Sequence, residues 1–429
     1  MSKFGPVALE PGVTRVNMWT LVFGAFATIG MVTGLAAMTP YVLTANLGLP
    51  ESDQGKALGF LALVQEIALI LVYSPLGVLA DRYGRRIVYV LGFAVLGAGY
   101  ALYPFATTLT ELSIFRLVYA LGIAAVTGMF ATLIADYGQQ GDRGKLTAIL
   151  GFLNGLGIVC ITLGIARLPA VFVANGVSDV DAGRYTMFIA AAACVVVAAL
   201  LFAGLKRHDP SAGPARKPFV ATMALGFAAA RQNRRIAIAY ASAFVARGDV
   251  AIVGLFAIAW GKSAAIAAGM APAAALSAGT IPFVIAQSAA LMWPAVIAVP
   301  LDRWARMTGL GVMMVLGAIG YCLMVFVDNP LLPAAIPFFV LLGIGQISAF
   351  LGAQTVIAKE APEAARGAVI GAFNFCGAVG ILILSVIGGW LFDHVGPWAP
   401  FMLVGILNGC VGVLALLEQR RENRLATAR

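Results

Sequence analysis

The chain of 429 residues is 61% hydrophobic and only 11% charged, with a mean hydropathy of +0.94. In soluble domains about a quarter of all residues are charged. This composition therefore excludes a water-soluble globular protein and indicates one embedded in lipid. The formal net charge of +9 comes mainly from residues between apolar runs. It therefore suits anionic lipid headgroups and not nucleic acid.

Apolar runs of transmembrane length fill most of the chain. A helix crosses the ~30 Å apolar layer of a bilayer with about 20 residues. We expect twelve such helices, because the runs are continuously apolar instead of alternating and are bounded by charge, Pro or Gly. They are Met18 to Leu43, Ala57 to Leu79, Ile87 to Phe105, Leu112 to Leu133, Leu146 to Ala166, Tyr185 to Leu205, Ile236 to Trp260, Ile281 to Val299, Leu310 to Val327, Leu331 to Ile357, Ala368 to Leu391 and Pro400 to Leu417.

The basic residues predict the orientation. If the N terminus is inside, 22 of the 28 Lys and Arg residues lie in cytoplasmic segments. By the positive-inside rule we expect both termini in the cytoplasm, in the inner (plasma) membrane of the cell. All five Cys lie singly inside apolar runs, so neither disulfides nor metal ligands are expected. The remaining basic residues are Lys56, Arg167, Arg184 and Lys262 outside, and Arg116 and Arg247 within runs.

One short polar sequence occurs twice. Gly77-Val-Leu-Ala-Asp81-Arg82-Tyr-Gly84-Arg85-Arg86 follows the second run, and Ala298-Val-Pro-Leu-Asp302-Arg303-Trp-Ala305-Arg306 follows the eighth, 221 residues later. A second pair agrees, because Asp142-Arg143-Gly144 and Arg366-Gly367 each precede an apolar run, and Gly157 maps onto Gly380 at a spacing of 223 residues. Two landmarks with nearly one offset predict two related halves.

The longest hydrophilic stretch, Lys206 to Arg235, joins these halves. It begins with Lys-Arg-His-Asp-Pro-Ser-Ala-Gly-Pro, which is typical of a flexible linker. Phe219, Met223 and Phe227 then recur every four residues, so Pro218 to Ala230 could form a short amphipathic helix on the inner membrane surface. We therefore expect one six-helix bundle in residues 1–205, a cytoplasmic linker in 206–235, and a second bundle with a cytoplasmic tail in 236–429.

Three ionisable residues lie well inside apolar runs, where each needs a partner, water or a functional role. They are Glu66 in the second run and Arg247 and Asp249 in the seventh. Residues two apart are about 200° apart around a helix. Arg247 and Asp249 therefore cannot pair directly unless Gly248 marks a break; one should face a central cavity and the other the packed side of its bundle. Glu66 maps onto Gln287 at the offset of 221 residues.

The sequence from Gly77 to Arg86 resembles the loop 2–3 signature of the major facilitator superfamily, and the weaker copy at Asp302 to Arg306 lies where that family repeats it. Twelve spans, an inside N terminus and a basic central linker agree over essentially the whole chain. The resemblance implies an all-α membrane protein whose two six-helix bundles, related by a pseudo-twofold axis, rock around a central site. Helices 1, 4, 7 and 10 would line that site.

The resemblance also implies a cytoplasmic gate. Asp81 would face the N terminus of helix 11, just after Arg366-Gly367, only while the cytoplasmic side is closed. Loss of this contact should favour the inward-open state by about 1 kcal/mol. The alternative is that Arg82, Arg85 and Arg86 only enforce the orientation. The expected gating residues are Gly77, Asp81, Arg82, Gly84, Arg85, Arg143, Asp302, Arg303, Arg306 and Arg366.

Two further motifs are similar to the proton-coupled drug-efflux branch of the family. Arg116-xxx-Ala120-x-Gly122, with Asp136 closing the same run, resembles the helix 4 arginine motif, although Ala120 replaces its usual first glycine. That arginine takes part in proton transfer or substrate binding; the alternative is an arginine that snorkels to the outer headgroups. Gly151-Phe-Leu-Asn-Gly155-Leu156-Gly157 partly resembles the antiporter signature, but Leu156 stands in place of its proline.

Within this framework the ionisable residues acquire candidate roles. A proton-coupled transporter needs a carboxyl group that binds and releases a proton, which Asp249 and Glu66 could provide. Arg247 and Arg116 are candidates for substrate binding. The alternative is a static network in which Glu66 or Asp249 is locked to one of these arginines. Weaker substrate-binding candidates, whose polar groups more often join helices, are Tyr119, Asn154, Gln346 and Asn374.

No HExxH, GxSxG or Walker-type phosphate loop occurs in the sequence, so we expect no enzyme, cofactor or metal site. We expect a monomeric secondary transporter in the lipid bilayer, whose partners are protons and a small organic solute. Proton-coupled export of an amphipathic compound fits the motifs best. The alternatives are a proton symporter that imports an organic anion held by Arg116 and Arg247, and a non-transporting relative that acts as an assembly factor or sensor.

Overall fold

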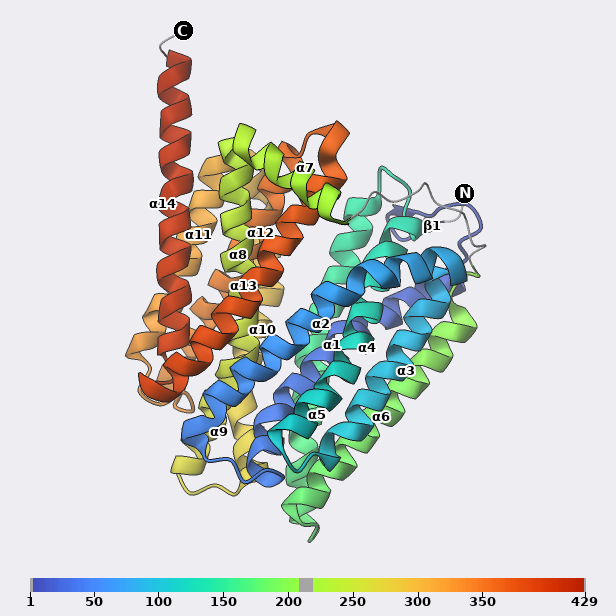
Figure 1. Cartoon of the computed structure of the whole chain (residues 1–429), viewed down its shortest axis with the longest axis vertical. Coiled ribbons are helices and arrows are strands. Elements are labelled where there is room, and N and C mark those ends of the chain that lie inside the picture. The colour runs from blue at the N-terminus through green and yellow to red at the C-terminus, as the bar shows by residue number, and fades with distance from the viewer. Residues whose placement is uncertain (1–2, 208–218, 428–429) are drawn as a thin grey trace. The chain divides into compact units, whose positions relative to one another are not determined.

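The computed structural model describes residues 3–207 and 219–427, without the side chains of residues 219, 220, 302, 364, 426 and 427. Figure 1 shows that helices dominate the described chain. The α-helices are α1 (Arg15–Ala45), α2 (Gln54–Tyr83), α3 (Arg85–Leu102), α4 (Leu109–Tyr137), α5 (Arg143–Ala174), α6 (Asp179–Gly204), α7 (Phe219–Gln232), α8 (Arg234–Ile252), α9 (Ile258–Ala267), α10 (Pro272–Arg303), α11 (Arg306–Cys322), α12 (Ile336–Glu360), α13 (Arg366–His394) and α14 (Ala399–Thr427).

The shorter elements cap or join these helices. Five of those described are 3-10 helices, and η3 (Val253–Ala257) is a π-helix. The 3-10 helices are η1 (Glu51–Asp53), η2 (Tyr103–Phe105), η4 (Leu323–Phe326), η5 (Pro333–Ala335) and η6 (Glu363–Ala365). The strands are β1 (Lys3–Phe4) and β2 (Val7–Ala8), which form an antiparallel hairpin.

Twelve helical segments of the described chain are long and apolar enough to cross a membrane. The expected all-α integral membrane protein is therefore confirmed. The helices are longer than the apolar runs, because they continue to polar caps. The first begins at Arg15, where the Thr14 side chain accepts a hydrogen bond from Asn17 N, and the eighth begins at Pro272 instead of Ile281. The seventh comprises α8, η3 and α9.

The chain divides into two compact units. The first contains residues 1–51, 64–215 and 265–280, and the second contains residues 52–63, 216–264 and 281–429. Helix α2 thus contributes its start to the second unit and the rest to the first. The expected bundles of residues 1–205 and 236–429 describe the repeat in the sequence and stay a prediction.

The same helix pairs pack together in each unit. Helix α1 packs on α5 and α3 on α4 and α6, while α8 packs on α13 and α11 on α12 and α14. Gly157 of α5 lies against the carbonyl of Phe26, and Gly380 of α13 lies against the carbonyl of Phe244, so closely that a methyl group on either glycine would overlap the carbonyl oxygen. The two glycines paired by their sequence offset therefore make the same contact between helices.

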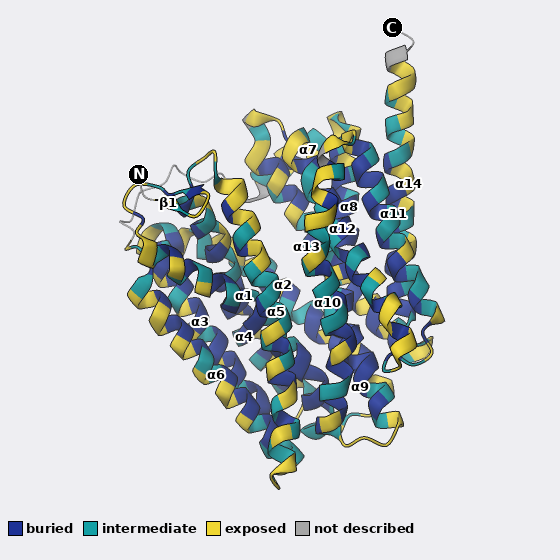
Figure 2. Cartoon of the chain, turned by 180° about the vertical axis from the view of Figure 1, so that it is seen from behind, coloured by how far each residue is buried: buried dark blue, intermediate teal, exposed yellow. Residues whose placement is uncertain are grey.

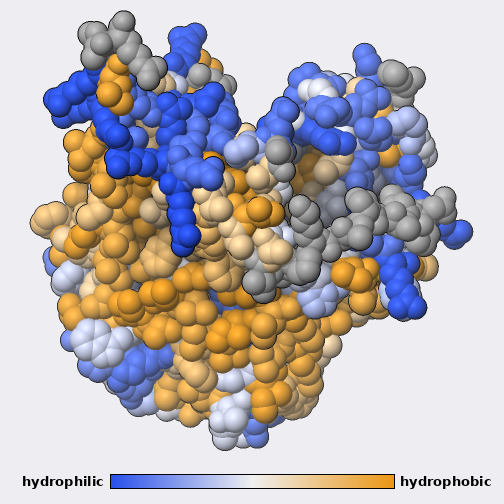
Figure 3. Space-filling model, turned by 45° about the horizontal axis from the view of Figure 1, so that its top comes forward, coloured by the Kyte–Doolittle hydropathy of each residue, from blue (hydrophilic) through white to orange (hydrophobic). Residues whose placement is uncertain are grey.

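Apolar side chains lie on the outside of the helices as well as between them. Figure 2 shows exposed positions along the outer faces of α3, α6 and α14, where Leu91, Val195 and Leu414 are more than half exposed. In Figure 3 hydrophobic residues cover most of the middle of the face in view, and hydrophilic residues gather mainly in its upper part. This distribution is expected for helices solvated by lipid.

The hairpin at the N terminus docks on the connection between α4 and α5. Ala8 N donates to Asp142 Oδ2 at 2.8 Å, and Gln139 N donates to the Ala8 carbonyl at 3.1 Å. Val7 and Leu9 are buried in this contact. The segment is too short and irregular for a periodic pattern, so sequence analysis did not anticipate it.

Helix α7 forms at the position expected for the amphipathic helix of the linker, whose residues 208–218 lie outside the described chain. It packs in the second unit against α8 and α13 (Figure 1). Tyr240 of α8 donates to the Gly226 carbonyl at 3.0 Å, and its ring centroid lies 5.8 Å from that of Phe227.

Candidate functional site

The membrane-spanning part of helix α8 carries Arg247 and Asp249 on opposite faces. It is a regular α-helix through Ile252, so Gly248 does not break it. Asp249 is fully buried, whereas Arg247 is half-buried. The expected separation of the two charges around the helix is therefore found, and no ion pair between them occurs in the described chain.

Asp249 lies inside the second unit among other buried polar groups. Asn408 of α14 and Tyr321 of α11 lie beside it, and the Asn408 amide is within reach of the carboxyl group. Within the described residues, no hydrogen bond of normal geometry reaches either carboxyl oxygen of Asp249, the Tyr321 hydroxyl or the Asn408 amide, and all of these atoms are buried. An ionised carboxylate in such surroundings costs several kcal/mol. The geometry therefore suits a carboxyl group that carries a proton.

Arg247 extends from the other face of α8 across α13. Its stem lies directly against Gly377, where any side chain would overlap it. Its guanidinium Nη2 donates to Asn374 Oδ1 at 2.9 Å, and Asn374 is exposed. The structure thus brings together two expected substrate-binding residues. They present a cation and an amide on an accessible face of the second unit, which is a suitable arrangement for a polar or anionic group.

A π-helix follows Asp249 by one turn. Val253 N donates to the carbonyls of both Asp249 and Val250, and η3 continues to Ala257. Segments of this kind occur frequently at functional sites because their hydrogen bonding is irregular. Nothing in the composition of Val-Gly-Leu-Phe-Ala distinguishes this segment from the helix around it, so sequence analysis did not find it.

Arg116 lies in the interior of the first unit. It is only 2% exposed, and its Nη1 lies 3.2 Å from the Tyr103 hydroxyl and 3.4 Å from Thr39 Oγ1. The centre of its guanidinium lies 5.5 Å from the Tyr119 ring centroid. These neutral groups hold the cation by hydrogen bonds and cation–π attraction. The burial disagrees with the alternative of an arginine that snorkels to the headgroups.

The remaining intramembrane candidates lie mainly between helices. Tyr119 donates to the Val32 carbonyl of α1 at 2.7 Å, and Asn154 Oδ1 accepts from Ile29 N at 3.2 Å. Gln346 is buried, and its Oε1 accepts from Gln287 Nε2 at 3.4 Å. Glu66 is buried in α2 with 6% of its surface exposed. These four polar groups join or fill helix contacts, and their roles toward a solute stay predictions.

The first repeated turn connects α2 to α3. Gly84 separates the helices at a φ of +89°, a conformation that L residues rarely adopt. Arg85, the first residue of α3, forms an ion pair with Asp136 at the end of α4. This pair ties together two helix ends of the first unit.

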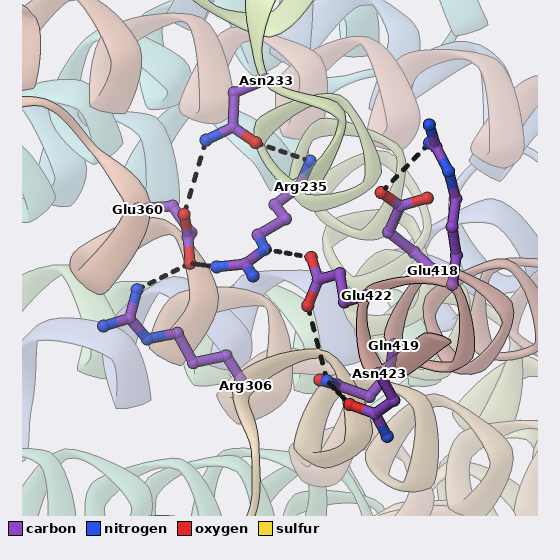
Figure 4. A network of polar contacts seen from close by, with 9 residues as sticks. Asn233, Arg235, Arg306, Glu360, Glu418, Gln419, Glu422 and Asn423 are labelled. Atoms are coloured by element: carbon purple, nitrogen blue, oxygen red, sulfur yellow. Dashed lines mark hydrogen bonds and ion pairs between the residues drawn. The ribbon is translucent and has the colours of Figure 1, made fainter. Parts of the chain in front are cut away.

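The second repeated turn makes the same connection with more partners. Arg306 at the start of α11 donates to Glu360 Oε1 at the end of α12 at 2.7 Å. Arg235 of α8 donates to the same oxygen at 3.0 Å and also pairs with Glu422 of α14 (Figure 4). Asp136 and Glu360 were not expected as gate partners, although they are separated by 224 residues and each ends its helix.

The other expected gating residues lie at or near the ends of α2, α10, α5 and α13. Asp81 is half-buried near the end of α2, and the contact expected for it stays a prediction. The side chain of Asp302 lies outside the described residues. Gly77 is half-exposed, Arg82, Arg303 and Arg366 are exposed, and Arg143 donates from Nε to the Gly138 carbonyl at 3.0 Å.

A carboxylate near the other end of α13 was missed by the sequence analysis. Asp393 accepts hydrogen bonds from Gly55 N at 2.8 Å and Lys56 N at 2.7 Å. It therefore caps the N terminus of α2, where a negative charge is favoured. All three residues belong to the second unit. Asp393 is the second-last residue of its apolar helix, so its sequence position looked like an ordinary polar boundary.

Small residues bring these two helices into backbone contact. Gly55 and Gly59 of α2 face Ser385 and Gly389 of α13, so closely that a methyl group on Gly55, Gly59 or Gly389 would overlap the facing carbonyl. Each helix thus carries a pair of small residues four apart, the spacing that permits close crossing of transmembrane helices. Nearby, Lys262 is fully buried, and its Nζ donates to Gln54 Oε1 at 3.0 Å.

Two magnetosome proteins are similar to this chain over most of its length. It is 28% identical over 437 residues to magnetosome protein MamH of Paramagnetospirillum magneticum, covering 99% of this chain and 97% of MamH. It is 25% identical over 410 residues to magnetosome protein MamZ of Magnetospirillum gryphiswaldense, covering 91% of this chain but only 60% of MamZ.

The fold is similar to that of a solved transporter. The crystal structure of nucleoside transporter NupG superposes with a TM-score of 0.72 at 14% sequence identity, covering 94% of this chain and 99% of NupG. The family model described as Major Facilitator Superfamily matches residues 21–383 and 283–428. Together with twelve candidate membrane spans, this match shows that the chain belongs to the Major Facilitator Superfamily, whose members transport solutes across membranes.

Proposed function

We propose that this protein is a proton-coupled secondary transporter in which Asp249 carries the proton and Arg247 contacts the solute. The observation that supports this assignment is the fully buried carboxyl group of Asp249, which has no cationic partner among the described residues, on the same helix as the accessible Arg247. A rotation or tilt of α8 would act on both groups at once. The helix therefore offers a direct mechanical link between protonation and solute binding.

The order of the transport steps follows from the burial of Asp249. While Asp249 is enclosed beside Tyr321 and Asn408, its neutral form is the one that needs no countercharge. Movement of α8 that admits water beside Asp249 lets the proton leave. The same movement changes where Arg247 lies relative to Asn374. The protein would then bind solute and proton in alternation. Protons that move inward down their gradient would in this way drive export of the solute.

Export of an amphipathic compound is the direction that we propose. It rests on the resemblance of the loop 2–3 and helix 4 motifs to the drug-efflux branch. The test uses purified protein in proteoliposomes with the amphipathic anion 8-anilinonaphthalene-1-sulfonate as the probe and an imposed pH gradient. Proton-driven export of this probe is expected for the wild type and should be abolished in Asp249→Asn. Equal transport by wild type and Asp249→Asn would contradict the assignment of the proton to this residue.

A readout independent of the solute accompanies this test. Infrared difference spectra recorded during a pH titration should contain the carbonyl stretch of a protonated carboxyl group, and Asp249→Asn should remove it. Glu363→Gln, an exposed carboxyl outside the bundle interior, serves as the matched control and should leave the band unchanged. If the band persists in Asp249→Asn, another carboxyl such as Glu66 carries the proton.

The burial of Arg116 favours a second candidate, the import of an organic anion. Its contacts in the described chain are with hydroxyl groups and aromatic rings, none of which carries a negative charge. A cation in this state attracts anions. The two candidates predict opposite effects of an imposed pH gradient on solute accumulation. Arg247→Glu should abolish anion uptake but only alter selectivity in an exporter of amphipathic compounds.

The end-to-end similarity to MamH supports a further candidate, a role in the magnetosome membrane. The test is to express this chain in a strain of Paramagnetospirillum magneticum that lacks MamH. If the wild-type chain restores what that strain lost with MamH, but the double variant Asp249→Asn/Arg247→Ala does not, a transporting role there is favoured. If both proteins restore it, the non-transporting assembly factor or sensor is favoured.

A further inference from the structure

A basic pocket lies in the first unit where α1 and α3 begin and α6 ends. Its volume is about 610 Å³, and its lining includes Asn17, Arg86, Phe202, Lys206 and Arg207. Three lining residues are cationic, and none of the lining residues in the described chain is acidic. The pocket therefore favours an anion.

The buried guanidinium of Arg86 is the core of the pocket. Arg86 is only 8% exposed, its Nη2 donates to the Phe202 carbonyl, and its guanidinium lies 4.5 Å from the Phe202 ring centroid. Its Nε is buried and has no hydrogen-bond partner among the described residues. The neighbouring Arg85 pairs with Asp136, whereas Arg86 is held by Phe202 and has no carboxylate partner among the described residues.

Two further cations complete the arrangement. Arg207 lies close enough to Arg86 for the two positive charges to repel each other. Lys206 donates one Nζ hydrogen to the Pro11 carbonyl at 2.9 Å, which leaves the other hydrogens of its ammonium group for another acceptor. A group with several anionic oxygens would satisfy Arg86 and relieve the repulsion. Phosphate has this chemistry and is bound by guanidinium groups through paired hydrogen bonds.

The surroundings of the pocket favour a lipid as the source of the phosphate. Phe202 is 55% exposed, and Ile87 and Leu91 in the first two turns of α3 are 44% and 54% exposed. Acyl chains can lie along these apolar side chains while a headgroup occupies the pocket. Under the expected orientation, this is the cytoplasmic leaflet, where anionic lipids and basic pockets meet. We propose that the pocket binds the phosphate group of an anionic phospholipid.

The test measures lipid binding by the full chain in detergent. Native mass spectrometry and thermal shift would follow titrations with dioleoyl phosphatidylglycerol, dioleoyl phosphatidylcholine and inorganic phosphate. Phosphatidylglycerol should bind and stabilise the wild type, and phosphatidylcholine, whose headgroup carries no net charge, should bind more weakly. Arg86→Gln and Arg207→Gln should each weaken binding of phosphatidylglycerol by roughly tenfold or more, as expected for a lost charge-assisted contact.

The control is Arg231→Gln, an exposed arginine in the last turn of α7, which should leave binding unchanged. Arg207 is exposed, so Arg207→Gln keeps the test decisive even if Arg86→Gln destabilises the fold. Inorganic phosphate that competes with the lipid would support the same site, and binding of phosphate alone would assign a soluble source. The proposal is overturned if both pocket variants bind phosphatidylglycerol and phosphate as the wild type does.

Discussion

Gly84, in the turn between α2 and α3, is the residue whose backbone conformation most clearly requires glycine. Its φ of +89° is costly for any residue with a β-carbon. We expect Gly84→Ala to destabilise the protein by about 1–3 kcal/mol, visible as a lower midpoint of thermal unfolding in detergent. Gly144→Ala is the matched control, because Gly144 has no positive φ and nothing within 4 Å of an added methyl group. Equal shifts for both variants would contradict the argument.

The sequence predicted some of the residues at the candidate site and did not predict others. The rule that a charge in an apolar run needs a role found Arg247 and Asp249, and helical geometry correctly placed them on different faces. The same rule could not find Asp393 or Glu360, since a carboxylate at a helix end is common. Their importance depends on which helix end lies opposite, namely Gly55 for Asp393 and Arg306 for Glu360.

At the scale of elements, paired glycines set how closely helices approach. Gly157→Ala and Gly380→Ala should each destabilise the protein by about 1–3 kcal/mol or more, because the added methyl group overlaps the backbone of the facing helix. Gly164→Ala, also on α5, has open space around it and is the control. Chemical denaturation in detergent would give the three values. If only one of the paired glycines is sensitive, the two contacts are not equivalent.

The N-terminal hairpin provides a pH-dependent element. Hydrogen bonds from the Lys145 side chain and from Ala8 N hold the pKa of the Asp142 carboxyl below its ordinary value of 3.8. The lower pKa in the folded state means that the carboxylate stabilises docking at neutral pH, and that this contribution is lost as the pH falls through the folded pKa.

Hydrogen exchange of residues 3–10 tests this element. We expect protection of the hairpin in the wild type at neutral pH and loss of that protection in Asp142→Asn. The wild type should approach the variant in strongly acidic buffer. Asp328→Asn, which changes an exposed carboxyl in a loop of the second unit, is the control. Protection that survives in Asp142→Asn at neutral pH would show that the apolar contacts of Val7 and Leu9 are sufficient for docking.

Elements were predicted well where the pattern was long. The twelve apolar runs and the short helix within the linker were found, because lipid solvation forces continuous helices and amphipathic spacing marks the short one. Helix ends were predicted several residues too short, since capping groups such as Thr14 and Pro272 extend helices beyond the apolar run. The hairpin was missed because its partner, the connection around Gln139, is distant in sequence.

For the whole molecule, two carboxylates at opposite ends of α2 make a paired prediction. Asp393 holds the start of α2 to α13 on the side expected to be external, and Asp81 is proposed to act at the cytoplasmic end. Asp393→Asn should therefore shift the population toward the outward-open state, and Asp81→Asn toward the inward-open state. Each shift should be on the order of 1 kcal/mol, about a fivefold change in the ratio of states.

Double electron–electron resonance between spin labels on the external helix ends measures these populations. The double variant should return toward the wild-type ratio if the two effects oppose each other. Asp328→Asn again controls for the loss of a carboxyl group elsewhere. Shifts of the same sign in both single variants would show that the carboxylates stabilise the fold in general and do not select a state.

The fold of the whole molecule was the most predictable level, since the repeated turn and the paired glycines repeat at nearly one offset. The substrate was the least predictable. It depends on side chains such as Arg247 and Asn374, which are 127 residues apart and come together only through the packing of α8 on α13.

The π-helix after Asp249 affects how this chain should be aligned with its relatives. It accommodates one additional residue in a turn, so side chains after Ala257 are displaced by about 100° from the direction that uninterrupted counting assigns. Mutations copied by position from a relative without this segment will reach the intended neighbour up to Ile252 and a different one from Ile258 onward. An alignment gap inside η3 corrects the numbering for Trp260 and Lys262.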